Sequence, residues 1–416
     1  MAHAMPLTPQ ELIEQKPQLG ATGLRLSAAA AAVGLVALLA SIALGMAAGG
    51  GMGSLLFHLQ WNLVYFTTIS LGALFFVMLQ HLTRASWSVV VRRIAENLAA
   101  AIIVLTPLLL LVAILDVTVY HQLYPWSDKA QVAGEAILLG KSAYLNPAFF
   151  ILRLALCAGV WMALACYFGG TSSRQDASGD PRLTLRMWRF SAPGMLLFAL
   201  TTTIFAVDVV MSVDPHWYST IFGVYIFSGS VISTIAALTL AAMGLQYAGR
   251  LRRAITVEHY HDLGKLLFAF TFFWGYIAFS QFMLYWYADI PEETNWYARR
   301  FNGEWMGVSV ALLFFHLLIP FFILLSRLVK RRKRLLAVMC VWMLAAHWLD
   351  LYWLLLPELA AKSAEPGRLI LSPLALTCAL AVGGLWLGGA AWLAGRQAIV
   401  PLRDPLLEDS LRFENV

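Results

Sequence analysis

Two aspartates stand inside long apolar stretches of this sequence. Asp208 lies in FAVDVVMSVDPHWYSTIFG, residues 205–223, and Asp350 lies in the run that ends at Pro357. Each is preceded by an arginine 19 residues earlier and followed by a proline seven residues later. A carboxylate at the centre of a membrane helix costs about 2.5–3.5 kcal/mol, so water, a partner side chain or a ligand must face it. Carboxyl groups placed in this way can accept protons and pass them on.

Other polar side chains in apolar stretches extend this pattern toward a proton relay. His347 lies three residues before Asp350, on the same face of a helix, and we expect Arg153 to pair with Asp208. Proton transfer needs such groups within about one water molecule of each other, facing a bundle interior. The remaining candidates lie within apolar runs or at their ends: Glu96, Asp262, Lys265, Tyr276, Ser280, Glu304 and His316.

A structural role is the alternative interpretation for each of these residues. Asp208 and Asp350 would then form ion pairs or hydrogen bonds that hold the helices together, and His316 would be a packed, hydrogen-bonded histidine. Asp262 and Lys265 lie near a membrane interface, where helix capping and snorkelling explain them. Ligation of a haem by two facing histidines is disfavoured.

The composition is that of a membrane protein. Hydrophobic residues make up 60% of the chain and charged residues 12%, whereas soluble domains carry about 25% charged residues. A spanning helix needs about 20 mostly apolar residues. The sequence therefore predicts an all-α integral membrane protein with ten transmembrane helices, at residues 24–48, 55–80, 93–115, 147–170, 189–211, 217–247, 262–288, 303–328, 335–357 and 372–396.

The positions of the basic residues predict the orientation. Most Lys and Arg residues fall at the termini or in the loops after spans 2, 4, 6 and 8, and the run VKRRKR at 329–334 is the densest group. Loops rich in Lys and Arg stay on the cytoplasmic side, so we expect both termini to be cytoplasmic. Because the positive charge lies in short loops, nucleic-acid binding is not expected.

Spans 2–5 and 6–9 look like two copies of one unit. Asn146 near the start of span 4 aligns with Asn302 near the start of span 8, and the pattern around Asp208 recurs around Asp350. Four helices return the chain to its starting side, so two such bundles would be parallel repeats. The expected divisions are an N-terminal cytoplasmic segment 1–23, a peripheral span within 24–54, the bundles 55–215 and 216–360, and a peripheral span with a cytoplasmic tail within 361–416.

Glycines and prolines give further expectations for helix packing. The pairs Gly45 with Gly49 and Gly384 with Gly388 have GxxxG spacing, which suits close helix–helix contact. Pro107, Pro193 and Pro320 predict helix kinks. The four cysteines lie in apolar runs and form no CxxC or metal-site spacing.

Two stretches resemble a known family. They are DPHWYSTIFGVYIFSG at 214–229 and HDLGKLLFAFTFFWGYIAFSQFMLYWYADIPEETNWYARR at 261–300. Together with the plan of ten spans, they resemble the F subunit of alternative complex III, in the NrfD and polysulfide reductase-like group of membrane subunits.

The resemblance implies a membrane subunit of a bacterial quinol:cytochrome c, or other high-potential acceptor, oxidoreductase in a respiratory chain, located in the inner (plasma) membrane. Its expected partners are a second, homologous membrane subunit of that complex, an iron–sulfur subunit, multihaem cytochromes, a terminal oxidase and lipid. The sequence has no CxxCH and no cluster-binding cysteines. We therefore expect no redox cofactor in this chain, haem c and iron–sulfur clusters in its partners, and quinone or quinol as its one candidate ligand.

Two further functions stay open at this point. A free-standing secondary transporter would rock two repeats around buried charges. A purely structural subunit would use the same polar residues only to lock its helices together. In the favoured interpretation the chain scaffolds the complex and offers a proton path and a contact for quinone.

Overall fold

The computed structural model describes residues 7–14, 17–47 and 51–415, and helices account for most of these residues. Ten helices are long and apolar enough to cross a membrane, as predicted, and no β-strand is present in the described ranges. In chain order the spans are α2 (Ala21–Ala47), α3 (Gly51–Leu82), α4 to η1 (Val89–Tyr120), α8 (Pro147–Ser178), α9 to η4 (Arg182–Val213), α10 (Phe222–Tyr247), α11 (Val257–Ala288), α13 to α14 (Trp305–Leu325), α16 (Lys333–Ala361) and α17 (Leu374–Arg396).

Three spans contain π-helical segments, each of which holds a polar residue. Asp116 lies in η1, Asp208 in η3 and His316 in η5. Near His316 the cause is visible in the sequence: Pro320 has no N–H, so the carbonyl of His316 loses its usual donor four residues later. The pieces of these composite spans are α4 (Val89–Ala100), α5 (Ile102–Leu115), η1 (Asp116–Tyr120), α9 (Arg182–Phe205), η3 (Ala206–Val210), η4 (Met211–Val213), α13 (Trp305–Leu312), η5 (Leu313–Leu318) and α14 (Ile319–Leu325).

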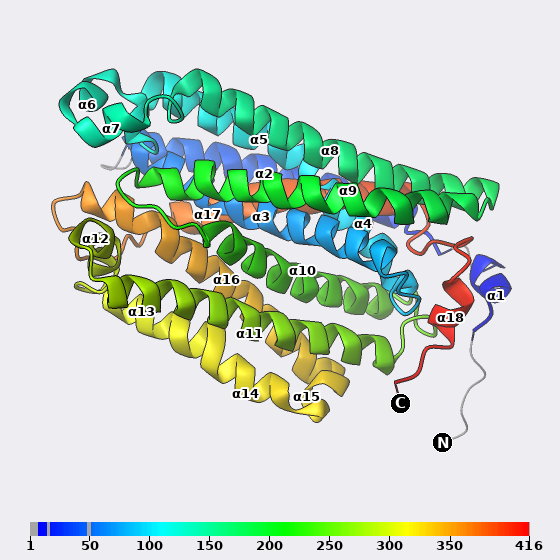
Figure 1. Cartoon of the computed structure of the whole chain (residues 1–416). Coiled ribbons are helices and arrows are strands. Elements are labelled where there is room, and N and C mark those ends of the chain that lie inside the picture. Colours follow the sequence, from blue (N-terminus) through cyan, green and yellow to red (C-terminus); the bar gives the residue numbers. More distant parts are fainter. Residues whose placement is uncertain (1–6, 15–16, 48–50, 416) are drawn as a thin grey trace.

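Contacts between helices group the spans into two sets (Figure 1). In the first set α3, α4–α5, α8 and α9 contact one another in succession, and α9 returns to α3. In the second set α10, α11, α13–α14 and α16 do the same, and α16 returns to α10. The contact of α3 with α10 joins the two sets. The division into units at 55–215 and 216–360, and the relation of these units as parallel repeats, stay predictions.

The two ends of the molecule carry different short helices. At one end, on the left of Figure 1, lie α6 (Lys129–Gly134), α7 (Ala136–Lys141) and α12 (Pro291–Arg300), and η2 (Pro125–Ser127) belongs to the same loop as α6 and α7. We call this the outer end, because the charge bias predicts that it faces away from the cytoplasm. The opposite, inner end holds α1 (Pro9–Glu14), α15 (Arg327–Arg331) and α18 (Leu407–Leu411), so the first and last described helices both lie there.

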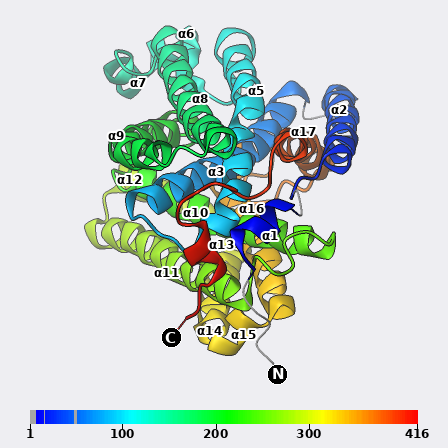
Figure 2. The ribbon, with the colours of Figure 1, turned by 90° about the vertical axis from the view of Figure 1, so that its right-hand side faces the viewer.

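The first and last spans pack side by side, as Figure 2 shows from the inner end. Gly34 of α2 and Gly384 of α17 face each other so closely that a Cβ on Gly384 would lie 2.7 Å from Gly34 Cα. The hydroxyl of Ser27 donates to the carbonyl of Gly388 at 2.8 Å. The close packing expected of Gly384 and Gly388 is thus confirmed. Gly45 packs against Leu55 of α3 instead, and Gly49 lies outside the described residues.

The C-terminal tail, residues 397–415, crosses the inner end and joins the two sets of helices. Arg92 of α4 donates to the Asp404 carboxylate, and both side chains are buried. The Ser410 hydroxyl donates to the carbonyl of Trp87 at 2.7 Å, and its own carbonyl lies 3.0 Å from Nε2 of His259 in α11. The tail is therefore part of the folded core at this end.

Candidate functional site

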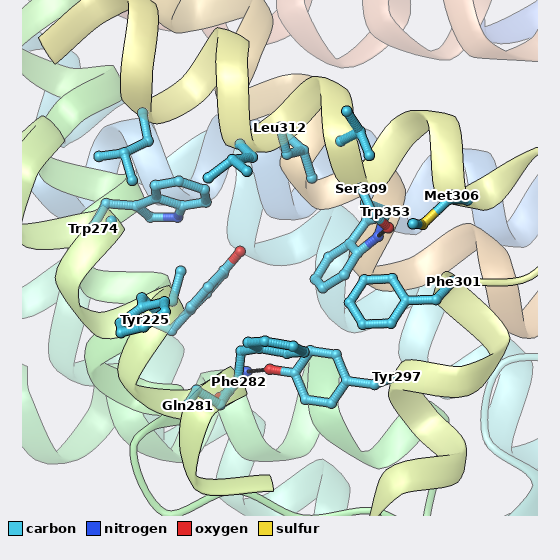
Figure 3. Close-up of a pocket in the computed structure, with 16 residues that line it drawn as sticks. Tyr225, Trp274, Gln281, Phe282, Tyr297, Phe301, Met306, Ser309, Leu312 and Trp353 are labelled. Atoms are coloured by element: carbon cyan, nitrogen blue, oxygen red, sulfur yellow. Dashed lines mark hydrogen bonds between the residues drawn. The ribbon is translucent and has the colours of Figure 1, made fainter. Parts of the chain in front are cut away.

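An apolar pocket of about 430 Å³ lies between α11, α12 and α13 in the outer half of the second set of helices (Figure 3). Its mouth is formed by side chains exposed on the membrane-facing surface, among them Phe279, Met306 and Leu313. Its inner wall holds the buried side chains of Tyr225 and Trp274. Pockets of 300–1,000 Å³ that are mostly apolar, with a few polar groups, are typical ligand sites.

The inner wall of the pocket connects directly to Asp350. The Tyr225 hydroxyl donates a hydrogen bond to Asp350 Oδ1, and the Trp274 indole N–H donates to Oδ2 at 3.2 Å. Asp350 itself is buried, and no Lys or Arg pairs with it among the described residues. The carboxyl group is therefore held by two neutral donors, Tyr225 and Trp274, and both of them line the pocket (Figure 3).

His347 lies behind Asp350 and offers a free nitrogen. Its Nε2 is 3.1 Å from the hydroxyl of Thr68, and that hydroxyl already donates to the carbonyl of Tyr65 at 2.7 Å. Nε2 must therefore carry the proton, which leaves Nδ1 unprotonated in the neutral ring. Nδ1 has no hydrogen-bond partner among the described residues and lies 3.9 Å from Asp350 Oδ2. A neutral acceptor thus stands next to the carboxyl group.

Two further features shape this region. The His316 ring stacks on Trp274 with centroids 3.8 Å apart, and both of its nitrogens lack a partner within the described ranges. Buried polar atoms of this kind mark places where ordered water is expected.

Gly229 of α10 makes room for His347, because a Cβ there would lie 2.5 Å from the imidazole.

Asp208 has a different environment in the first set of helices. Arg153 of α8 binds it through two contacts, Nε to Oδ2 at 2.7 Å and Nη2 to Oδ1 at 3.1 Å, so the expected pair is present. The same guanidinium donates to the carbonyl of Tyr144 at 2.9 Å and lies over the Tyr144 ring. The Asp208 carboxylate is therefore neutralised by a fixed positive charge. Burial raises the pKa of the neighbouring Tyr144 hydroxyl to about 12. In the predicted alignment of spans 4 and 8, the position of Arg153 is taken by Ser309.

A buried ionic network lies at the outer end between the two sets. Arg299 of α12 donates to the carboxylates of both Asp214 and Glu358. Arg300 lies 3.5 Å from Glu358 and donates to backbone carbonyls of α16, including that of Trp353 at 3.1 Å. Burial lowers the pKa of Arg300 to about 10.

This network reaches the outer surface through His216. The His216 ring lies 3.6 Å from Asp214 on one side and 2.7 Å from the Glu135 carboxylate on the other. Both outer side chains are about half exposed, whereas Asp214 is buried. A chain of titratable groups thus extends from the buried carboxylates to solvent.

Glu96 lies in a separate cluster at the inner end. Its carboxylate is 2.8 Å from Arg93 Nε and 3.7 Å from Arg92 Nε. Arg93 also contacts Asp176 at 2.8 Å, and Arg92 contacts the tail residue Asp404. Within the described residues no hydrogen bond or ion pair connects this cluster to Asp208 or Asp350. The relay expected from Glu96 outward is therefore not a continuous chain of side chains.

Several other expected relay residues point away from the bundle interior. Tyr276 is 58% exposed on the outward face of α11, and Ser280 is partly exposed on the same helix. Lys265 is half exposed and pairs with Asp262 three residues earlier, as capping and snorkelling predict. Glu304 lies on the surface and accepts from the backbone N–H of Leu369 at 2.9 Å. Tyr276, Lys265 and Glu304 are thus exposed and Ser280 is partly exposed, and a place for any of them in a proton path stays a prediction.

Tyr225 and Trp274 are the site residues that the sequence analysis did not select. Both sit in aromatic-rich spans, where their polar atoms look like ordinary interfacial groups. A signal was nevertheless present: each belongs to the stretches at 214–229 and 261–300 that carry the family resemblance. Comparison with known proteins adds no assignment, because no family model matches this chain and no curated protein matches it significantly.

Proposed function

We propose that this chain is an integral subunit of a quinol-oxidising respiratory complex in a bacterial plasma membrane, with both termini cytoplasmic. It would scaffold the complex, contact quinol in the pocket between α11, α12 and α13, and take up protons at Asp350. The observation that carries the proposal is the Tyr225–Asp350 hydrogen bond at the wall of a pocket that opens toward lipid. The family resemblance supplies the class of ligand.

The pocket fits a quinol by its chemistry. Flat aromatic walls such as Trp353 and Phe282 suit a planar ring, and the open side between α11 and α13 suits an isoprenoid tail in the bilayer. Only a few polar atoms face the ligand, among them those of Tyr225, Ser309 and Gln281. A neutral, lipophilic ligand with a hydroxyl group on its ring matches this distribution.

The hydrogen bonds define how a proton would leave such a ligand. A quinol hydroxyl next to the Tyr225 oxygen passes its proton to that oxygen, while the Tyr225 proton moves to Asp350 Oδ1. Nδ1 of His347 is the next acceptor, 3.9 Å from the carboxyl group. Oxidation of one quinol to quinone releases two protons and two electrons. The second proton would follow the same path once Asp350 has passed on the first. As the resemblance implies, an iron–sulfur cluster of a partner subunit would accept the two electrons and haem c would receive them next.

The two sets of helices would then have unequal roles. Arg153 neutralises Asp208 with two hydrogen bonds. A carboxylate held in this way is a poor proton carrier, because protonating it would break the ion pair. Asp350 has only neutral neighbours and can change its protonation state without breaking an ion pair. The network of Asp214, Glu358, Arg299 and His216 is the proposed way out to the outer surface. Water would have to carry the proton from Asp350 to Glu358, because no hydrogen bond or ion pair among the described residues joins the two.

Replacement of Tyr225 and Asp350 in the assembled complex tests the proposal. We expect Tyr225→Phe and Asp350→Asn to slow quinol oxidation by about 100-fold, the usual effect of removing a general acid–base group. Tyr352→Phe is a matched control, because Tyr352 is a buried tyrosine of α16 that donates to the carbonyl of Ile370 and does not line the pocket. Normal turnover and normal proton release in both relay variants would refute the proposal.

Photolabelling locates the ligand independently of turnover. An azidoquinone should label peptides from α11 and α13, and unlabelled quinone should compete. Labelling confined to other subunits would show that this chain does not contact quinol.

A chain that purifies from native membranes without haem-bearing partners would favour the transporter alternative.

The purely structural alternative draws support from the first set of helices, where the closed Arg153–Asp208 pair does what a structural lock would do. It predicts that Asp350→Asn changes stability while turnover and proton release stay at the wild-type level.

A further inference from the structure

A basic hollow of about 620 Å³ opens at the inner end, where α10 ends and α16 begins. Three cationic side chains line it, those of Arg252, Lys333 and Arg334. No carboxylate lines it, and among the described residues none of these three cations forms an ion pair. This sets the hollow apart from other basic positions at the same end: Arg331 pairs with Glu258, and Arg92 pairs with Asp404.

Two of the three cations, Lys333 and Arg252, are hydrogen-bonded to a buried glutamine, Gln246. The Gln246 side-chain oxygen accepts from Lys333 Nζ at 2.7 Å and from the Tyr260 hydroxyl at 2.9 Å. Its backbone carbonyl accepts from Arg252 Nε at 3.4 Å. The Gln246 amide is itself fixed by the carbonyls of Leu251 and Ile255. Gln246 therefore bonds both Lys333 and Arg252 at the lining of the same hollow, where one anion could contact both positive charges.

The backbone of α16 adds to the attraction for an anion. The helix begins at Lys333 and runs for 29 residues, and its N-cap residue, Arg332, makes no side-chain capping bond. The first N–H groups of a helix of this length point outward with a partial positive charge, which favours a negative group beside them.

The surface next to the hollow is apolar and faces the membrane. Met243, Tyr247 and Ala337 complete the lining, and Tyr247 is 93% exposed. Further along α16, Val338 and Val341 are more than half exposed. A ligand with a negative headgroup and hydrocarbon chains would place its charge among the cations and its chains along this surface.

We propose that this hollow binds the headgroup of an anionic phospholipid. The phosphate would lie among Arg252, Lys333 and Arg334, with Tyr247 and Met243 beside the glycerol and the first methylene groups. Basic pockets between membrane helices on the cytoplasmic side are suited to such headgroups. The site lies at the opposite end of the chain from the proposed quinol pocket and does not depend on that function.

Native mass spectrometry of the purified chain tests the site. Phosphatidylglycerol and cardiolipin are titrated against the wild-type chain and against Arg252→Gln/Lys333→Gln/Arg334→Gln. Each basic residue near an anionic headgroup is worth about fivefold in affinity, so we expect the triple variant to bind roughly 100-fold more weakly. The control is Arg182→Gln/Arg186→Gln/Arg189→Gln, which removes the same charge from exposed positions at the start of α9.

The outcomes separate the explanations. Equal losses in the two triple variants would show bulk electrostatics and overturn the proposal. Inorganic phosphate at millimolar concentration that displaces the lipid fully would assign the site to a soluble anion, which also overturns it. If the triple variant does not fold, a photoactivatable phosphatidylglycerol is used on the wild-type chain. Labelling at Met243 or Tyr247 supports the proposal, and labelling elsewhere alone refutes it.

Discussion

Gly229 leaves space for the His347 ring because glycine has no Cβ. In Gly229→Ala the new Cβ would lie 2.5 and 2.7 Å from two ring atoms of His347, closer than carbon atoms approach in folded proteins. The imidazole must therefore shift away from Gly229, and we expect this shift to break its hydrogen bond with Thr68. The lost hydrogen bond to Thr68 is worth about 1 kcal/mol, and overpacking of a filled core costs about 1–3 kcal/mol.

A gain in helix propensity offsets part of this loss. Alanine is better than glycine inside a helix by about 0.8–1.0 kcal/mol. The net expectation for Gly229→Ala is therefore a loss of about 1–3 kcal/mol in the free energy of unfolding. The measurement is reversible unfolding in mixed detergent micelles, followed by circular dichroism.

Gly244→Ala is the matched control on the same helix, because no atom lies within 4 Å of its Cβ position. Only the propensity gain applies there, and this variant should be equal to or slightly more stable than the wild type. In the double variant Gly229→Ala/His347→Ala the clash disappears, so the two substitutions should be non-additive by at least 1 kcal/mol. Equal stability of the two glycine variants, or strict additivity in the double variant, would refute the reasoning.

Three further predictions concern other contacts. Arg153→Ala leaves the buried carboxylate of Asp208 without its partner and should cost about 3–5 kcal/mol, whereas replacing both residues by leucine should cost much less; chemical unfolding of these two variants and of the wild type checks this. Gly384→Leu forces α17 away from α2 and should lower the yield of an oxidative cross-link between cysteines introduced on the facing sides of the two helices, whereas the wild-type spacing should give the cross-link readily. Asp404→Asn removes the carboxylate that binds the tail to Arg92 and should make the tail sensitive to proteolysis. It should also lower stability, because buried Arg92 is left with Glu96 at 3.7 Å; an unchanged cleavage pattern would contradict this.

The sequence predicted the elements well because membrane helices are read from length and polarity alone. Each of the ten runs contains enough apolar residues to span, and charged residues mark its ends. The Arg153–Asp208 pair was also predictable, since both residues lie about two turns from the outer ends of neighbouring spans. The GxxxG spacing of Gly384 and Gly388 indicated which face of α17 packs closely on another helix, because small residues are needed only where helices touch. In the structure that helix is α2.

The partners of Asp350 were not predictable in the same way. Tyr225 and Trp274 come from two other spans, and helix periodicity does not specify which faces of separate helices meet. The outward direction of Tyr276 follows from the rotation of α11 in the bundle, which depends on its packing against α10 and α14. The π-helical segment at Ala206–Val210 shifts the register around Asp208, and nothing in the sequence of that segment specifies the shift.

The pairing of the first span with the last has a consequence for synthesis at the ribosome. About 330 residues separate the end of α2 from the start of α17, so at 5–20 residues per second α2 waits for roughly 15–70 s before its partner is made. During that time the glycine-lined side of α2 stands in the bilayer without its partner. An insertase or a lipid must cover it until translation ends, and a nascent chain that stops before Leu374 would be left with an orphaned helix that quality-control proteases can extract.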